Sequence, residues 1–260
     1  MTDEVNYDLL NKNTTQTKEE EDFPTLLKKA SFEGFATFFF MISIYFSGGD
    51  IKVFIFGMWA ILCCFGIVSG AHVNPAITFG FYIYEAKWLN GGLKFILYFI
   101  FQTLGCVLGA LIARVIVGLD PVYVIIPKSQ NFNVYFAEFF FTGSFFFFIA
   151  YVVDPKIKVT EHGPIQCALI VGWFYLIVNA GSVLSGAAYN PAVLLVLNII
   201  AYLNGKNEVT GHIPLMIVAE LLGVAVFALI FKYVFKSYYN WDLHKTNDSD
   251  FGKIEEVEAK

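Results

Sequence analysis

Long apolar runs dominate the chain, and each is bounded by polar or charged residues. A helix needs about 20 residues to cross the roughly 30 Å hydrocarbon core of a bilayer, since each residue adds about 1.5 Å. Six runs approach that length, and they lie at 32–48, 51–68, 93–118, 134–153, 164–181 and 213–235. Two shorter apolar stretches, 75–86 and 191–203, begin at prolines and would reach only about half-way across. The pattern predicts six membrane-spanning helices and two half-length helices.

The composition supports a membrane protein and excludes other classes. Of the 260 residues, 57% are hydrophobic and only 15% are charged, against roughly 25% charged in soluble domains. The four cysteines all fall within apolar runs, and their spacing indicates neither a disulfide framework nor a metal site. The sequence contains no nucleophile and base set and no phosphate-binding loop. We therefore expect no enzyme activity, no cofactor, no metal and no nucleic-acid partner.

The basic residues near the ends of the runs predict the orientation, because cytoplasmic loops collect Lys and Arg. One side would carry Lys28, Lys29, Lys87, Lys94, Lys156, Lys158 and Lys236, and the other only Lys52, Lys128 and Lys206. Both termini should then be cytosolic in an integral multi-pass protein of the plasma membrane or an internal membrane. The tails at 1–30 and 237–260 are polar, carry much of the net charge of −5, and are expected to be disordered.

One segment of the sequence occurs twice. Ser-Gly-Ala-His-Val-Asn-Pro-Ala at 69–76 returns 116 residues later as Ser-Gly-Ala-Ala-Tyr-Asn-Pro-Ala at 185–192. The surroundings repeat too, because Glu33 matches Glu138 and Gln102-Thr-Leu-Gly matches Glu220-Leu-Leu-Gly. The predicted domain at 31–236 thus contains repeat one (31–118) and repeat two (134–236), each with three spans and one half-span.

Three spans are an odd number, so repeat two must enter the membrane from the opposite side, as in an inverted repeat. The two half-helices would then enter from opposite faces and meet near the midplane. Irregular backbone at that depth is tolerated only inside protein or along a wet cavity. The topology therefore predicts a pore between the two half-helices.

The start of each half-helix suggests the chemistry of this pore. Asn is a good N-cap and Pro is tolerated at the first helical position, and two facing helix N-termini repel cations. The expected pore centre consists of Asn74, Pro75, Ala76, Asn190, Pro191 and Ala192. The two amides can donate to a passing oxygen. The segments before them should expose carbonyl acceptors to a neutral solute, and they consist of Gly70, Ala71, His72, Val73, Gly186, Ala187, Ala188 and Tyr189.

The duplicated signature and the Glu, Gln and Gly positions resemble the major intrinsic protein family of aquaporins and aquaglyceroporins over about 30–236. The resemblance implies an all-α membrane fold with six tilted helices and two re-entrant half-helices, and a homotetramer with one pore per subunit. It also implies that Glu33 and Glu138 accept hydrogen bonds from the re-entrant loops. For His72 it favours a hydrogen bond that fixes the loop, although a pH-sensitive gate is the alternative.

The resemblance further points to four positions of a narrow outer filter. Counting from the two Asn residues without gaps places Phe54, Val178, Ala187 and Val193 there, and a shift of one residue would replace Val178 by Asn179. The family normally has Arg where this chain has Val193. Without the donors and charge of Arg, the filter should be apolar and wider than a filter for water alone. Such walls suit a small polyol, but they could also slow water by dewetting.

The sequence thus predicts a passive channel in the lipid bilayer for water, small uncharged solutes such as glycerol, or both. Two other classes of membrane protein remain as alternatives to a channel. A non-conducting or gated structural protein of the same fold is possible because of the altered filter. A secondary transporter also uses inverted repeats, but it would ordinarily need charged coupling sites, which these loops lack.

Overall fold

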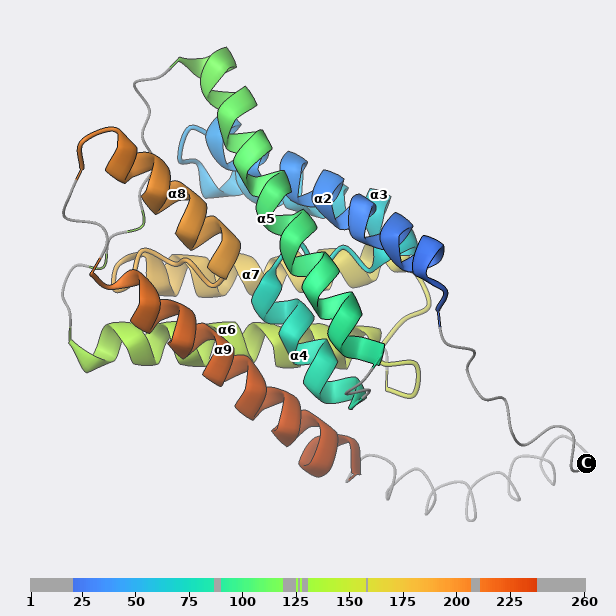
Figure 1. The fold of residues 1–260 in the computed structure, drawn as a ribbon. Helices are drawn as coiled ribbons and strands as arrows, with labels where there is room; N and C mark the ends of the chain where they lie inside the picture. The colour runs from blue at the N-terminus through green and yellow to red at the C-terminus, as the bar shows by residue number, and fades with distance from the viewer. Residues whose placement is uncertain are drawn as a thin grey trace, which may run out of the picture.

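The computed structural model of the protein describes residues 21–86, 90–118, 125, 127, 131–157, 159–206 and 211–237, and every regular element in these ranges is a helix (Figure 1). The long helices are α2 (Phe23–Phe46), α3 (Ile51–Ser69), α5 (Asn90–Val117), α6 (Phe132–Val153), α7 (Gly163–Ser182) and α9 (Ile213–Leu229), which continues as η2 (Ile230–Phe235). The short helices are α4 (Pro75–Glu85) and α8 (Pro191–Leu203). The predicted fold of six long and two half-length helices is confirmed.

Helix α2 begins earlier than the apolar pattern indicates. The expected tail at 1–30 is too long, because the helix starts at Phe23 rather than near residue 31. Asp22 caps this start by accepting a hydrogen bond from the Thr25 N–H at 3.2 Å, and a proline occupies the first turn. Residues 1–20, and residues 238–260 of the other expected tail, lie outside the described residues.

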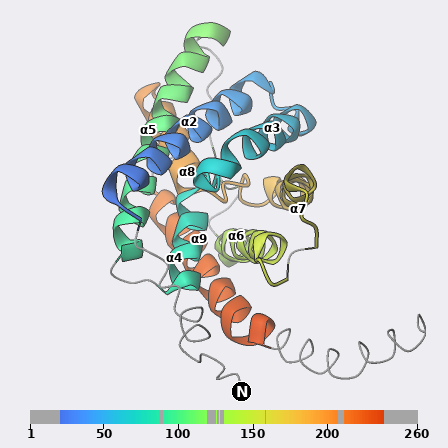
Figure 2. The same cartoon turned by 90° about the vertical axis from the view of Figure 1, so that its right-hand side faces the viewer.

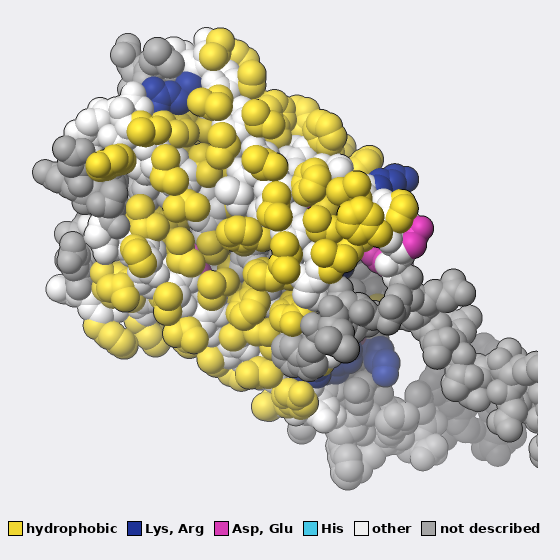
Figure 3. Space-filling model, viewed as in Figure 1, with side chains coloured by type: hydrophobic (Ala, Val, Ile, Leu, Met, Phe, Trp, Pro, Cys, Tyr) yellow, Lys and Arg dark blue, Asp and Glu magenta, His cyan; other side chains and the backbone are white. Residues whose placement is uncertain are grey.

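The helices suit a bilayer by length, composition and surface. Five described helices are long and apolar enough to cross a membrane, at 51–69, 91–117, 132–153, 163–182 and 213–235. Apolar side chains cover most of the face shown in Figure 3. Single residues are strongly exposed, such as Ile67 at 88% and Val115 at 79%. Exposed apolar surface on this scale is rare on soluble monomers and is expected where lipid is the solvent.

Two helix pairs form the most extensive contacts, and they are equivalent in the two repeats: α2 packs on α5, and α6 packs on α9. Glycines allow the backbones to touch at both crossings. A Cβ built on Gly105 would lie 3.0 Å from the carbonyl carbon of Gly34, and one built on Gly223 would lie 2.7 Å from that of Phe139. The internal repeat of the sequence is therefore also a repeat of the packing.

The half-helices lie between these pairs. Both α4 and α8 contact α5 and α9, and they also touch one another (Figures 1 and 2). Their N-terminal ends point to the middle of the molecule, while their C-terminal ends point to opposite sides (Figure 1). The first residues of both half-helices, Pro75, Ala76, Pro191 and Ala192, are buried. The fold thus brings two helix N-termini together in its interior.

Candidate functional site: a pore between two half-helices

The two asparagines cap the half-helices in the same way. Asn74 has an extended backbone, and its Oδ1 accepts a hydrogen bond from the Ala76 N–H at 2.8 Å. The Oδ1 of Asn190 accepts from the N–H of Ala192 at 3.1 Å and from that of Val193 at 3.4 Å. In both cases Pro follows at the first helical position, where its missing N–H costs no hydrogen bond. Both half-helices therefore start at a fixed residue.

The side-chain amide of each asparagine also binds the loop of the other repeat. Asn74 Nδ2 donates to the Tyr189 carbonyl at 2.6 Å, and Asn190 Nδ2 donates to the Val73 carbonyl at 2.9 Å. An amide nitrogen has two N–H groups, so one of them remains for a further acceptor on each side. These reciprocal bonds hold the two positive helix ends against one another.

The loops before the two asparagines share an unusual backbone. Besides Gly70 and Gly186, four non-glycine residues have positive φ: Ala71 at 44°, Val73 at 46°, Ala187 at 56° and Tyr189 at 47°. Left-handed backbone is rare outside glycine, most of all for a β-branched residue such as Val73. Strain of this kind persists only where surrounding contacts enforce it.

Two buried carboxylates supply these contacts. Glu33 on α2 accepts hydrogen bonds from the backbone N–H groups of His72 and Val73, both at 2.9 Å. Glu138 on α6 accepts from Ala188 at 3.2 Å and Tyr189 at 3.0 Å. Both glutamates are fully buried. Hydrogen bonds to a charged acceptor are stronger than neutral ones, so each carboxylate fixes the loop of its own repeat.

Further polar side chains surround the first loop, and the sequence pattern did not identify all of them. Gln102 Nε2 donates to Glu33 at 2.8 Å and to the Thr78 hydroxyl at 3.0 Å, and Thr78 also contacts the His72 ring nitrogen at 3.1 Å. The Tyr98 hydroxyl donates to the Ser69 carbonyl at 2.8 Å. The side chain of His72 thus has a hydrogen-bond partner within its own repeat. Thr78 and Tyr98 were missed, although Thr78 lies one turn after Asn74, where a hydroxyl in an apolar helix is a signal.

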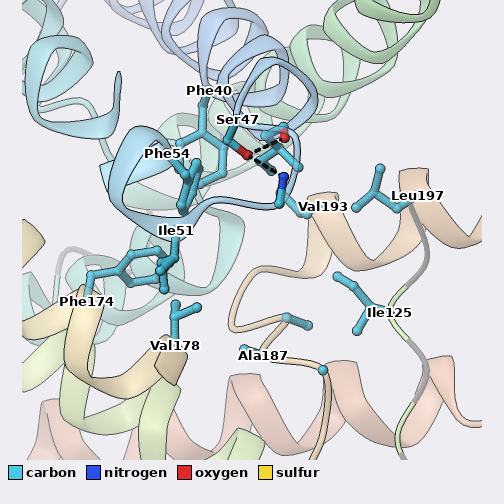
Figure 4. A pocket seen from close by; sticks show the side chains of 14 residues that line it. Phe40, Ser47, Ile51, Phe54, Ile125, Phe174, Val178, Ala187, Val193 and Leu197 are labelled. Carbon is cyan, nitrogen blue, oxygen red and sulfur yellow. Dashed lines mark hydrogen bonds between the residues drawn. The ribbon is translucent and has the colours of Figure 1, made fainter. Parts of the chain in front are cut away.

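A cavity of about 260 Å³ opens on one side of the loops (Figure 4). All four expected filter residues line it: Phe54, Val178, Ala187 and Val193. The Phe54 ring contacts Phe174 with centroids 6.1 Å apart. Asn179 is exposed and is not among the lining residues, and its amide donates to the Tyr175 carbonyl of its own helix at 2.7 Å. Of the two neighbouring residues, Val178 therefore lies on the cavity wall and Asn179 does not.

A second cavity of about 470 Å³ lies on the other side of the loops. The first loop, from Ser69 to Val73, forms one of its walls, and helices α3 and α7 form others. Glu85 and Lys94 are its charged lining residues, whereas the first cavity has none. The two cavities therefore flank the hydrogen-bonded junction of the half-helices, where Asn74 and Asn190 are 3% and 4% exposed. In the described residues, no group of three His, Cys, Asp or Glu side chains is placed to hold a metal ion.

This arrangement can be compared with known proteins. The family described as Major intrinsic protein matches residues 49–231, which is more than half of the chain. The chain belongs to the major intrinsic protein family.

Relatives of this major intrinsic protein include plant aquaporins. Aquaporin TIP1-1 of Arabidopsis thaliana is 35% identical over 142 residues, which cover 53% of this chain and 54% of the relative. Aquaporin TIP1-2 of Musa acuminata is 31% identical over 175 residues, covering 65% and 64%. The chain thus spans about half to two thirds of the length of these relatives. The X-ray structure of the aquaglyceroporin from Plasmodium falciparum has the same fold, with a TM-score of 0.70, 20% identity, and coverage of 83% of this chain and 99% of that one.

Outside its spans, this major intrinsic protein has a polar cluster that the sequence analysis missed. Lys236, just after η2, donates to Asp154 at 2.6 Å, and Tyr84 at the end of α4 hydrogen-bonds both residues. Burial raises the pKa of Asp154, but the hydrogen bonds from Lys236 and Tyr84 outweigh it and hold this pKa below its ordinary value. The cluster ties the end of the first half-helix to the ends of α6 and η2.

Proposed function

We propose that this protein is a passive transmembrane channel for water, small uncharged solutes such as glycerol, or both. The observation that carries the proposal is the junction of the two half-helices, where Asn74 and Asn190 bind the opposite loops between two cavities. Two facing helix N-termini disfavour cations there, while the remaining amide N–H groups and the loop carbonyls can replace the hydration of a neutral solute. The names of the relatives, aquaporins and an aquaglyceroporin, make water and glycerol the first solutes to test.

The apolar filter supports a preference for solutes with an apolar face. Phe54, Val178, Ala187 and Val193 present hydrocarbon to the first cavity, and no lining side chain of that cavity carries a charge. A small polyol can place its carbon backbone on such walls while its hydroxyls reach the loop carbonyls. Exclusion of protons and cations then depends mainly on the opposed helix ends, because the Arg usual in the family is absent.

The assembly and placement that we propose follow from the resemblance and the charge pattern. The protein would form a homotetramer with one pore per subunit, in the plasma membrane or an internal membrane. Both termini would be cytosolic, in keeping with the excess of lysines on that side. Epitope accessibility in intact and permeabilised cells tests the orientation, and cross-linking in the membrane tests the tetramer.

Volume changes of purified proteoliposomes test conduction. Vesicles are placed under gradients of an impermeant sugar and then of glycerol, urea and ammonia, with empty vesicles as the control. We expect faster water or solute flux than in empty vesicles for at least one solute. Rates equal to those of empty vesicles for every solute would favour a structural protein of the same fold, and saturable flux driven by an ion gradient would favour a transporter.

Substitution at the filter tests the selectivity. We expect Val193→Arg to lower the flux of glycerol and urea, because the long side chain enters a cavity of about 260 Å³, while water still passes. Val183→Arg is the matched control, since Val183 follows α7, is 55% exposed and does not line the cavity. Unchanged glycerol and urea flux in Val193→Arg would show that the filter lies elsewhere.

A further inference from the structure

The two repeats contain the same scaffold, which allows a comparison residue by residue. In each, a buried Glu fixes the loop: Glu33 in repeat one and Glu138 in repeat two. A second buried polar residue lies on the partner helix, Gln102 on α5 and Glu220 on α9. Gln102 lies three residues before Gly105, and Glu220 lies three residues before Gly223. At these two glycines the helix backbones touch, and the partner in each contact, Gly34 or Phe139, is the residue just after the loop-fixing Glu. Gln102 and Glu220 therefore occupy equivalent positions.

In repeat one the nitrogen of the Gln102 amide has two acceptors, while its oxygen has no hydrogen-bond partner among the described residues. This nitrogen donates to the Glu33 carboxylate at 2.8 Å and to the Thr78 hydroxyl at 3.0 Å. An amide is neutral and can donate, so it suits a carboxylate that already accepts two backbone N–H groups. The buried negative charge of Glu33 is thereby surrounded by donors, as burial of a charge requires.

The scaffold of repeat two lacks these donors. Leu194 stands where repeat one has Thr78, and Ala188 stands where it has His72. Glu220 replaces the amide and lies beside the carboxyl group of Glu138. It is 0% exposed, and no donor in the described part of the chain lies in hydrogen-bond geometry with either of its oxygens.

Two neighbouring carboxyl groups in a dry site do not both ionise, because each negative charge would be desolvated and repelled by the other. A single proton removes the difficulty: the protonated carboxyl group donates an O–H to the ionised one. Glu138 is the member that accepts two backbone N–H groups, which favour its ionised form. The proton therefore belongs on Glu220.

We propose that Glu220 is a neutral carboxylic acid that donates a hydrogen bond to the Glu138 carboxylate, and so positions the second loop as the Gln102 amide positions the first. Glu220 is then a positioning residue, since it acts on the pore through Glu138, Tyr189 and Asn190. The inference concerns the scaffold of the proposed channel and does not depend on which solute passes.

The proton makes the second loop sensitive to pH in one direction. Below the pH at which Glu220 ionises, the hydrogen bond is intact, and as the pH rises through that point two adjacent negative charges replace it. The groups that face Glu220 are Glu138 from α6 and Tyr189 from the loop before α8. The titratable groups of the other elements packed on α9 are Tyr82, Tyr84 and Glu85 on α4, Tyr202 on α8, and Lys232 and Tyr233 on η2. The Gln102 amide of repeat one has no proton to lose in this way.

Infrared spectroscopy and flux measurements on the purified full chain test the proposal. The wild type should show the carbonyl stretching band of a protonated carboxylic acid at pH 7.5, where surface carboxylates are ionised, and Glu220→Gln should lose this band. Gln102→Glu creates the same pair in repeat one and should gain a band. Absence of the band from the wild type, or its persistence in Glu220→Gln, would overturn the assignment, and neither result depends on whether the pore conducts.

The flux measurement distinguishes a protonated donor from a residue that only fills space. Proteoliposomes with the wild type, Glu220→Gln and Glu220→Leu are compared at one pH. Flux through Glu220→Gln should equal that of the wild type, because its amide also donates to Glu138, whereas Glu220→Leu, which fills a similar volume without a donor, should lose flux several-fold. Equal flux through Glu220→Leu and Glu220→Gln would refute the role of the donor.

Discussion

The contact between α6 and α9 can be tested with a single methyl group. A Cβ added at Gly223 would lie 2.7 Å from the carbonyl carbon and 2.9 Å from the Cα of Phe139, whereas ordinary contacts begin at 3.4 Å. Because these are backbone atoms, no side-chain rotation relieves the overlap, and α9 must move away from α6 by more than about 0.7 Å, since the carbonyl oxygen of Phe139 lies nearer still to this Cβ. Overpacking of this kind costs about 1–3 kcal/mol. Alanine recovers about 0.5–1 kcal/mol of helix propensity relative to glycine, so Gly223→Ala should be destabilised by up to about 2.5 kcal/mol.

The matched control is Gly172→Ala on α7. No atom lies within 4 Å of a Cβ built at Gly172, so only the gain in helix propensity remains, and stability should be unchanged or higher. The free energy of unfolding is measured by titrating mixed micelles with a denaturing detergent, and flux is measured in proteoliposomes. Gly223→Ala should also lower flux, because Glu138 and Glu220 lie beside this contact and hold the loop before Asn190. Equal stability of the two variants would refute the close packing of α6 and α9.

Other substitutions probe the junction, the scaffold and the polar cluster. We expect Asn190→Asp to raise cation conductance, since it places a negative charge between the helix ends. The control is Asn179→Asp, which lies outside the pore lining and should leave conductance unchanged. Equal cation conductances of the two variants would argue against a pore at the junction of the half-helices. Glu138→Gln removes a charged acceptor from two N–H groups and should cost about 1.5–3 kcal/mol of stability, measured by the same detergent titration. The lowered pKa of Asp154 means that its contribution is present above about pH 4 and is lost as the pH falls further; the midpoint of thermal unfolding should therefore drop in acid for the wild type and less for Asp154→Asn.

The sequence was most informative where the signal is local and repeated. The apolar runs predict the long helices, and an Asn-Pro pair before a short apolar stretch predicts each half-helix, because capping and chain length depend on neighbouring residues alone. The start of α2 was missed, since Lys28 and Lys29 look like part of a solvated tail. The local signals were nevertheless present, because Asp22 followed by Pro24 is a typical helix start.

Contacts between distant segments could not be predicted in the same way. The choice between Val178 and Asn179 depends on the rotation of α7, which is set by tertiary packing. The cluster of Tyr84, Asp154 and Lys236 joins residues up to 152 positions apart, and no local pattern indicates such a contact. The pairing of Glu138 with Glu220 likewise depends on where α6 crosses α9.

The reciprocal hydrogen bonds of the asparagines also have a consequence for biogenesis. Asn74 binds a carbonyl 115 residues further along the chain, and Asn190 binds one 117 residues back. While a ribosome is still translating the first repeat, the partner of Asn74 does not yet exist, and the buried amide has no carbonyl to bind. The first re-entrant segment can adopt its final form only after the second has been synthesised and inserted. Completion of the pore is therefore a late step, and a chain that stops after the first repeat leaves that step undone.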